Sequence, residues 1–130
     1  MSLKSICIDF DGVVHSYEDG WQDGKIYGHV LPGFFEWAVK AKAQFKLVIY
    51  SSRSHTEEGN RLMQSWIQRE LETWSKGNSS VLSIQDFFFA TAKPPAWVYI
   101  DDRAITFRGN WKAKELDPEV LANFKTWSEQ

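Results

Sequence analysis

The sequence has little cysteine, no long hydrophobic run and no excess of one charge. Cys7 is the single cysteine among 130 residues, which excludes an internal disulfide and favours a cytoplasmic protein over a secreted one. No apolar run approaches the roughly 20 residues that a membrane-spanning helix needs, and no signal-peptide pattern precedes a small-residue cleavage site. We therefore expect a soluble cytoplasmic protein that has no membrane partner.

The charges almost balance, with 15 Lys and Arg against 17 Asp and Glu and a formal net charge of −2. This balance gives no general attraction to nucleic acid or to anionic membranes. A hydrophobic content of 43% over 130 residues is ordinary for one globular domain with a real core. No repeat, low-complexity tract or linker divides the chain, so we expect a single domain over residues 1–130.

Apolar runs alternate with amphipathic stretches along the chain. Strands are expected at residues 5–10, 45–50, 87–89, 97–100 and 104–107. Helices are expected at residues 32–43, 57–74 and 118–127, with a turn at 76–80 after the second. The Gly- and Asp-rich segment 13–30 is typical of a flap or small hairpin. This alternation predicts an α/β fold with a mostly parallel sheet, in a Rossmann-like three-layer sandwich with helices on both faces.

Acidic residues follow two of the expected strands. The segment ICIDFDGVV is an apolar strand that ends in two carboxylates one residue apart. Such carboxylates repel each other and are costly near a core, so a cation is the first explanation for them. Ligand sites in α/β sheets lie outside the carboxyl ends of the strands. We therefore expect one site to contain the polar residues that follow the strands, namely Asp9, Asp11, Ser51, Asp101 and Asp102.

Carboxylates without His or Cys ligands favour Mg²⁺, which often shares its site with phosphate. One carboxylate can attack phosphorus, and a second can protonate the leaving oxygen and then activate water. Positive charge and backbone N–H groups can hold the phosphoryl oxygens. Taken singly, some candidates have simpler explanations: Ser51 as a strand-end cap, Lys93 as a surface lysine, and His15, His29 and His55 as flap or loop residues.

The order of these motifs resembles the haloacid dehalogenase superfamily, whose members are mostly Mg²⁺-dependent phosphohydrolases. "IDFDGVV" resembles the first motif, which implies Asp9 as nucleophile and metal ligand and Asp11 as general acid/base. Asp11 would reach the metal through its backbone carbonyl. "LVIYSS" is similar to the second motif and implies that Ser51 binds the phosphoryl group. Gly12 and Ser52, which belong to these two motifs, are expected to bind the substrate.

"AKPP" is similar to the third motif and implies Lys93 as the cation that steadies phosphate and nucleophile. "VYIDD" resembles the fourth, in which Asp101 and Asp102 hold the metal. The resemblance favours Asp102 as the direct ligand, with Asp101 bonding water or Lys93. An acid at Asp11 implies hydrolysis of a phosphate monoester, because a halide leaving group needs no proton.

Neither the flap nor residues 53–92 leave room for a lid domain. An open site implies a large substrate, or closure by a partner subunit in a homo-oligomer. "SSR" and "IDDR" resemble the 3′-phosphatase domain of polynucleotide kinase/phosphatases, which implies that Arg53 and Arg103 lie near the phosphate of a nucleic-acid end. They can equally be ordinary helix-start and loop arginines. The alternative function is a non-catalytic phosphate-binding or phospho-accepting signalling module, or a partner-binding protein with an inactive site.

Overall fold

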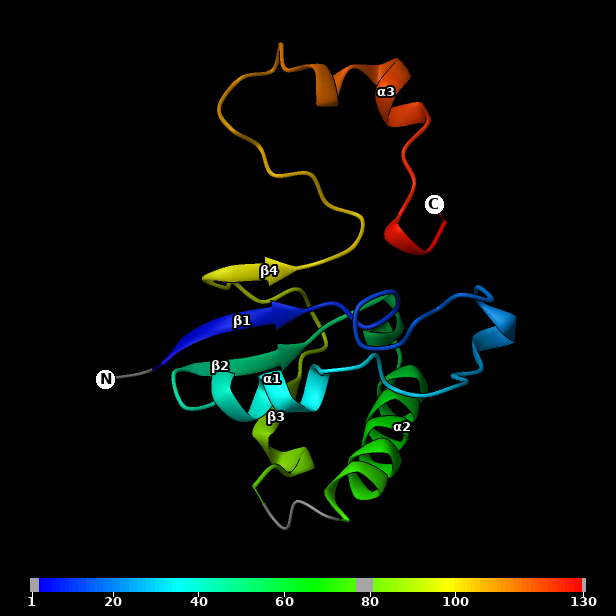
Figure 1. Cartoon of the computed structure of the whole chain (residues 1–130), viewed down its shortest axis with the longest axis vertical. Coiled ribbons are helices and arrows are strands. Elements are labelled where there is room, and N and C mark those ends of the chain that lie inside the picture. Colours follow the sequence, from blue (N-terminus) through cyan, green and yellow to red (C-terminus); the bar gives the residue numbers. More distant parts are fainter. Residues whose placement is uncertain (1–2, 77–80, 130) are drawn as a thin grey trace.

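The computed structural model describes residues 3–76 and 81–129. Four strands form one parallel sheet in the order β3-β2-β1-β4 (Figure 1). The strands are β1 (Lys4–Ile8), β2 (Phe45–Ile49), β3 (Phe87–Phe89) and β4 (Val98–Ile100). The α-helices are α1 (Phe34–Ala41), α2 (Glu57–Ser75) and α3 (Pro118–Ala122). The predicted α/β class with a parallel sheet is therefore confirmed.

The register of the strands aligns their carboxyl ends. Ile8 at the end of β1 pairs with Ile49 of β2 and with Ile100 of β4. The residues that follow these strand ends therefore emerge at one edge of the sheet. The backbone N–H of Asp9 donates to the carbonyl of Ile100 at 2.9 Å, which fixes the first acidic residue beside the last strand.

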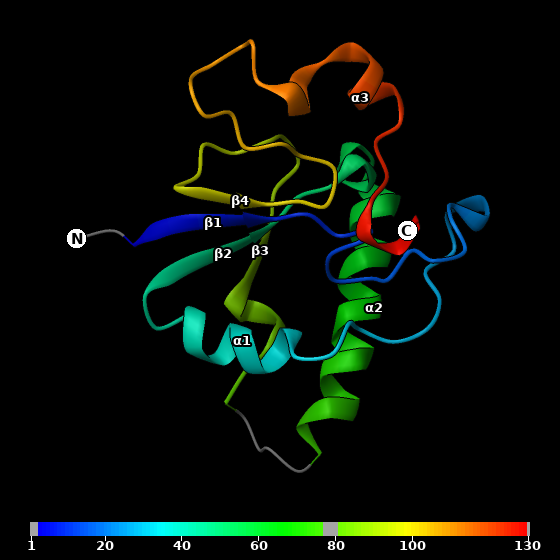
Figure 2. The same cartoon turned by 45° about the horizontal axis from the view of Figure 1, so that its top comes forward.

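Helices α1 and α2 pack on the same face of the sheet. The chain moves in one direction from β1 to β2 to β3, and right-handed crossovers then place both connecting helices on one side (Figures 1 and 2). A single buried cluster joins the two helices to this face, with members that include Ile6, Ile8, Leu47, Ile49, Phe35, Ala38, Met63, Trp66 and Ile67.

No helix in the described part of the chain packs on the opposite face of the sheet, which is only partly covered by side chains. Cys7 and Val48 are buried there but lie outside the cluster beneath α1 and α2. Their neighbours across the sheet, Phe88 and Tyr99, remain 49% and 45% exposed. Lysine side chains lie over both rings, at 4.4 Å for Lys46 on Phe88 and 4.9 Å for Lys93 on Tyr99. The predicted three-layer sandwich is thus not confirmed.

The predicted boundaries of α1 and α2 are close to the observed ones. Thr56 caps α2, because its side chain accepts a hydrogen bond from the N–H of Gly59 at 2.9 Å. Helix α1 begins at Phe34 and not at Pro32, because Gly33 takes a left-handed conformation with φ 89° just before it. Most of the predicted turn after α2, residues 77–80, lies outside the described residues. No helix in the described ranges is long and apolar enough to cross a membrane.

Two predictions beyond β4 are wrong. Residues 104–107 form no strand, and α3 ends at Ala122 instead of continuing to residue 127. We call residues 104–129 the C-terminal arm. Figure 1 shows α3 standing away from the sheet, and Val120 and Leu121 stay 51% and 41% exposed. A short amphipathic helix with no surface to pack against has little stability of its own, which explains its early end.

Candidate functional site

Three carboxylates meet at the carboxyl ends of β1 and β4. One side-chain oxygen from each of Asp9, Asp101 and Asp102 lies within 4.8 Å of the others. Burial, followed by the charge of Asp101, raises the pKa of Asp9 to about 7, and Asp102 and Asp11 contribute less. Burial and Asp101 also raise the pKa of Asp102. Burial and the neighbouring carboxylates both disfavour the ionised forms of Asp9 and Asp102, and a bound cation would favour those forms.

The two neighbouring acids of this cluster differ in their surroundings. The side chain of Asp101 is exposed, and its Oδ1 accepts the backbone N–H of Arg103 at 2.7 Å. Asp102 is half-buried, and its Oδ1 is fully buried without a hydrogen-bond partner among the described residues. A buried oxygen of this kind is costly unless something binds it. The donor set of carboxylate oxygens therefore fits a hard divalent cation.

A cavity of about 380 Å³ adjoins the acidic cluster and collects residues from all four sequence motifs. We call it the phosphoryl cavity, after the group that the sequence motifs predict it to bind. Its lining includes Asp9, Ser51, Ser52, Lys93 and Asp101. These residues come from four segments that are far apart in the sequence, and the parallel register brings them together. Of the five residues expected at the strand ends, three line this cavity, namely Asp9, Ser51 and Asp101, whereas Asp11 and Asp102 are not part of its lining.

Ser51 caps the turn that follows β2. Its Oγ accepts the backbone N–H of Arg53 at 2.9 Å, and its own N–H donates to Ser54 Oγ at 3.1 Å. A serine hydroxyl that accepts a hydrogen bond keeps its own O–H as a donor. The cap is therefore compatible with an O–H directed at an anion in the phosphoryl cavity, so Ser51 can serve both roles.

Asp11 lies apart from the acidic cluster and is held by two basic side chains. Arg53 donates from Nε to Asp11 Oδ2 at 2.8 Å and from Nη2 to Oδ1 at 3.2 Å. His15 Nδ1 lies 3.0 Å from Oδ1. Burial alone would raise the pKa of Asp11, but the hydrogen bonds of His15 and Arg53 outweigh it and lower the pKa. Asp11 is therefore an ionised, ion-paired carboxylate in this conformation.

His15 is a site residue whose role was not evident from the sequence. It is 0% exposed, and its ring lies among Phe10, Tyr27 and Trp66 at centroid distances of 5.6, 4.5 and 5.4 Å. These rings therefore surround the imidazole that contacts Asp11. The only signal in the sequence is its place four residues after Asp11, at the start of the flap.

Gly12 is enclosed by the acidic cluster and the C-terminal arm. Its N–H donates to the carbonyl of His15 at 2.6 Å, and its carbonyl accepts Nε1–H of Trp127 at 2.7 Å. Both backbone groups are thus engaged within the protein, whereas the sequence assigned Gly12 to substrate binding. Trp127, 115 residues away in the chain, was not identified from the sequence.

Gly12→Ala should be far more harmful than Gly109→Ala. Gly12 has φ 85°, and an added Cβ would lie 2.1 Å from Asp102 Oδ2. Gly109 is a matched control, because it has φ 87° but open space around the added Cβ. We expect Gly109→Ala to cost about 1–2 kcal/mol of unfolding free energy and Gly12→Ala at least about 2 kcal/mol more. Urea denaturation measures both, and equal losses would contradict the close packing of Gly12 on Asp102.

Arg103, His29 and His55, which the sequence offered as candidates, are not part of the lining of the phosphoryl cavity. Arg103 Nη2 lies 3.5 Å from Glu129 Oε1 at the end of the arm, and its side chain is 61% exposed. His29 lies 3.3 Å from Glu70 and is 86% exposed, while the ring of His55 lies near Tyr50, with centroids 6.1 Å apart. The structure thus gives Arg53 a place in the site and gives Arg103 a contact with the arm.

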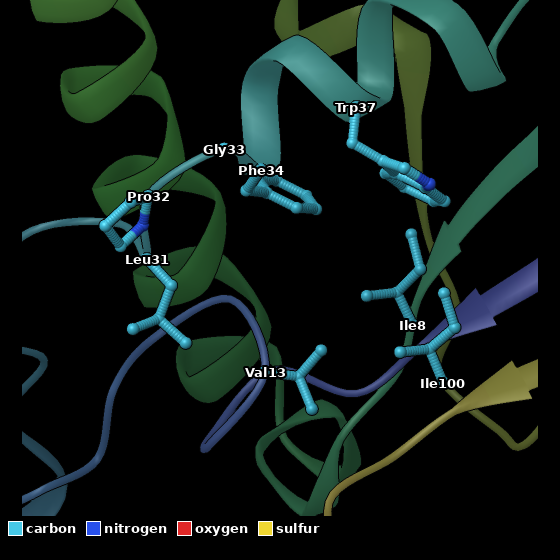
Figure 3. Close-up of a pocket in the computed structure, with 8 residues that line it drawn as sticks. All are labelled: Ile8, Val13, Leu31, Pro32, Gly33, Phe34, Trp37 and Ile100. Carbon is cyan, nitrogen blue, oxygen red and sulfur yellow. The ribbon is translucent and has the colours of Figure 1, made fainter.

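An apolar cavity of about 270 Å³ lies on the α1 side of the sheet (Figure 3). Phe34 and Trp37 face Val13, Leu31 and Ile100 across it. No side chain with a formal charge lines it, so it offers nothing that would hold a phosphate. The candidate site is therefore the phosphoryl cavity with Asp11 and Arg53 beside it.

The chemistry of this protein has to be inferred from these residues themselves. No family model, curated protein or solved structure matches the chain.

Proposed function

We propose that the protein is a Mg²⁺-dependent phosphatase that hydrolyses a phosphate monoester through an aspartyl-phosphate on Asp9. The observation that carries this proposal is the phosphoryl cavity, in which Asp9, Ser51 and Lys93 line one space beside three clustered carboxylates. This combination supplies a nucleophile, a hydroxyl donor, a cation and a metal site. It agrees with the resemblance to the haloacid dehalogenase superfamily. The proposal includes the three-layer Rossmann-like arrangement that this resemblance implies.

In the first step, a carboxylate oxygen of Asp9 attacks phosphorus, and the bond from phosphorus to the alcohol oxygen breaks. Ser51 and Lys93 would hold the phosphoryl oxygens. In the second step, water attacks the phosphorus of the aspartyl-phosphate, and Asp11 takes its proton. Free phosphate leaves and the Asp9 carboxylate is restored.

Asp11 is better prepared for the second step than for the first. Its ion pair with Arg53 keeps it ionised, as a base must be, whereas the departing alcohol in the first step requires a proton. We propose that a phosphoryl group draws part of Arg53 away from Asp11, so that the carboxyl can carry that proton. Arg53 would then link substrate binding to the proton transfer.

The proposed metal ligands are Asp9, Asp102 and Asp101, with the backbone carbonyl of Asp11. Mg²⁺ held there would neutralise negative charge on the phosphoryl oxygens and help to keep Asp9 ionised at neutral pH. Asp102 is our choice for the direct ligand, because its buried Oδ1 has no hydrogen-bond partner in the described part of the chain.

A phospho-accepting signalling module is the second candidate. The ion pair of Asp11 with Arg53 favours it, because a carboxylate that never released Arg53 could not protonate a departing alcohol, and Asp9 would then accept phosphate only from a donor whose leaving group needs no proton, such as an acyl phosphate. A nucleic-acid end as substrate, a cytoplasmic location and closure of the site by a second subunit remain predictions. A 3′-phosphorylated oligonucleotide therefore belongs among the substrates that are tested.

The decisive experiment compares the hydrolysis of an aryl phosphate by wild type, Asp9→Asn and Asp19→Asn, with Mg²⁺ and with EDTA. We expect turnover only with Mg²⁺, a loss of at least about 10³-fold in Asp9→Asn, and full turnover in Asp19→Asn, an exposed flap substitution. Undiminished activity in Asp9→Asn would refute the mechanism. Labelling of Asp9 by acetyl phosphate without turnover on a broad panel would favour the signalling module.

A further inference from the structure

A further cavity, of about 330 Å³, lies between the flap and the N-terminal end of α2. We call it the flap cavity. Its lining includes Trp21, Asp23, Ser52, Arg53, Glu58 and Leu62. The volume is at the lower end of the range for small-molecule sites. Figure 2 shows the flap, in blue, reaching out beside the first turns of α2. The mechanism proposed above assigns no part of the substrate to the flap cavity.

The flap cavity is next to the phosphoryl cavity, since Ser52 lines both. Arg53 lines the flap cavity while it holds Asp11 at 2.8 Å and donates to the flap carbonyl of Gly24 at 2.9 Å. The leaving alcohol has to depart toward its proton donor. With phosphorus at Asp9 and the proton at Asp11, the alcohol would lie on the side of Asp11 and its partner Arg53, and Arg53 lines the flap cavity.

An aromatic ring is fixed on one side of this cavity. Trp21 is 53% exposed, and the guanidinium carbon of Arg53 lies 4.7 Å from the centroid of its ring. The flap turn holds it, because the N–H of Gly24 donates to the Trp21 carbonyl at 2.9 Å and an added Cβ at Gly24 would lie 3.3 Å from the indole. A half-exposed indole is suited to stacking on a flat ring.

Carboxylates flank the same cavity. Asp23 and Glu58 line it from the flap and from α2. Ionised carboxylates accept hydrogen bonds from sugar hydroxyls, as acidic residues do with ribose in dinucleotide sites. They repel additional phosphates, so they disfavour a polynucleotide chain in this position.

We propose that the flap cavity binds the nucleoside part of a nucleoside monophosphate, with the base on Trp21 and the sugar hydroxyls toward Asp23 and Glu58. The proposal rests on the proposed phosphatase function and names its substrate class. It differs from the nucleic-acid end expected from the sequence, because the cavity accommodates a single nucleoside and its acidic side chains oppose a second phosphate.

The test compares kcat/KM for adenosine and uridine 5′- and 3′-monophosphates with kcat/KM for ribose 5-phosphate, which lacks the base. We expect a preference of at least about 10-fold for the nucleotides, and a lower rate with a 3′-phosphorylated oligonucleotide. Trp21→Ala should reduce this preference about 10-fold, and Trp21→Phe should retain most of it. Trp111→Ala is the matched control, since Trp111 is 80% exposed in the C-terminal arm, and it should leave the preference unchanged.

Calorimetric titration of Asp9→Asn with adenosine and uridine tests the cavity independently of catalysis. We expect binding that Trp21→Ala weakens in the same background. Equal kcat/KM for nucleotides and ribose 5-phosphate, or an oligonucleotide preferred over mononucleotides, would overturn the proposal while the phosphatase function stood. The two proposals can also fail separately. If turnover did not need Asp9 but Trp21→Ala still abolished nucleoside binding, the proposed mechanism would be refuted and nucleoside binding in the flap cavity would be supported.

Discussion

Replacing Arg53 by alanine is expected to lower the free energy of unfolding by about 3–5 kcal/mol, because it leaves a partly buried carboxylate without its counter-ion. Arg53 is 5% exposed. It donates to both oxygens of Asp11 and to the carbonyl of Gly24, and it lies over Trp21. The same substitution should reduce turnover at least about 100-fold, because it removes the group that orients Asp11.

Arg103→Ala is the matched control for stability. Its ion pair with Glu129, at 3.5 Å, is exposed, and such pairs contribute about 0–1 kcal/mol. Thermal and urea denaturation of both variants measures the difference, which should be a fall in melting temperature of roughly 10 °C or more for Arg53→Ala and almost none for Arg103→Ala. Similar losses for the two arginines would contradict the structural role assigned to Arg53. Arg53→Lys should recover little, because lysine lacks the planar fork that binds both oxygens.

Without metal, the protein should lose stability as the pH rises from about 4 to about 7. The folded-state pKa of Asp9 is raised to about 7 from 3.8, so the folded state holds a proton that the unfolded state has lost. Asp9 then contributes stability that is complete below pH 4 and is gone above pH 7. With solvent screening at this half-buried group, we expect a loss of about 2 kcal/mol. The pKa of Asp11 is lowered, so ionised Asp11 stabilises the folded state above about pH 4. This stabilisation is lost only as the pH falls below about 4.

Asp9→Asn should remove most of this pH dependence and stabilise the metal-free protein at pH 8 by about 1–2 kcal/mol, because it removes a charge that the other carboxylates repel. Urea midpoints measured with EDTA from pH 4 to pH 8 check this, with Asp19→Asn as the control on the flap. Mg²⁺ should stabilise wild type at pH 8 and have much less effect on Asp9→Asn. A flat wild-type profile with EDTA would contradict the raised pKa of Asp9.

The elements of the fold that depend on local pattern could be predicted well. The apolar runs at β1, β2, β3 and β4 were found to within two residues at each end, because buried parallel strands are continuous apolar segments between turn residues. The gathering of Asp9, Ser51 and Asp101 followed from a general rule of parallel sheets. The predictions failed at residues 104–107 and at the end of α3, where the pattern is amphipathic but the structure gives it nothing to pack against.

The partners of the site residues could not be predicted in the same way. Arg53 lies 42 residues from Asp11 and Trp127 lies 115 residues from Gly12. Nothing in the local sequence of an arginine distinguishes one that binds a carboxylate from one in solvent, as the different positions of Arg53 and Arg103 show. His15 looked like an ordinary flap residue, because its burial depends on aromatic side chains contributed by other segments.

The sequence by itself determined the parallel α/β class, the strand ends and the set of acidic and polar groups that they carry, because backbone pattern and residue type are local properties. Tertiary structure alone decided that α1 and α2 share one face and that Asp11 is paired with Arg53 and His15. It also decided that the flap forms a cavity with α2 and that the arm reaches Gly12. The physical reason is that ion pairs, cavities and burial arise where distant segments pack, and their positions follow from the whole chain.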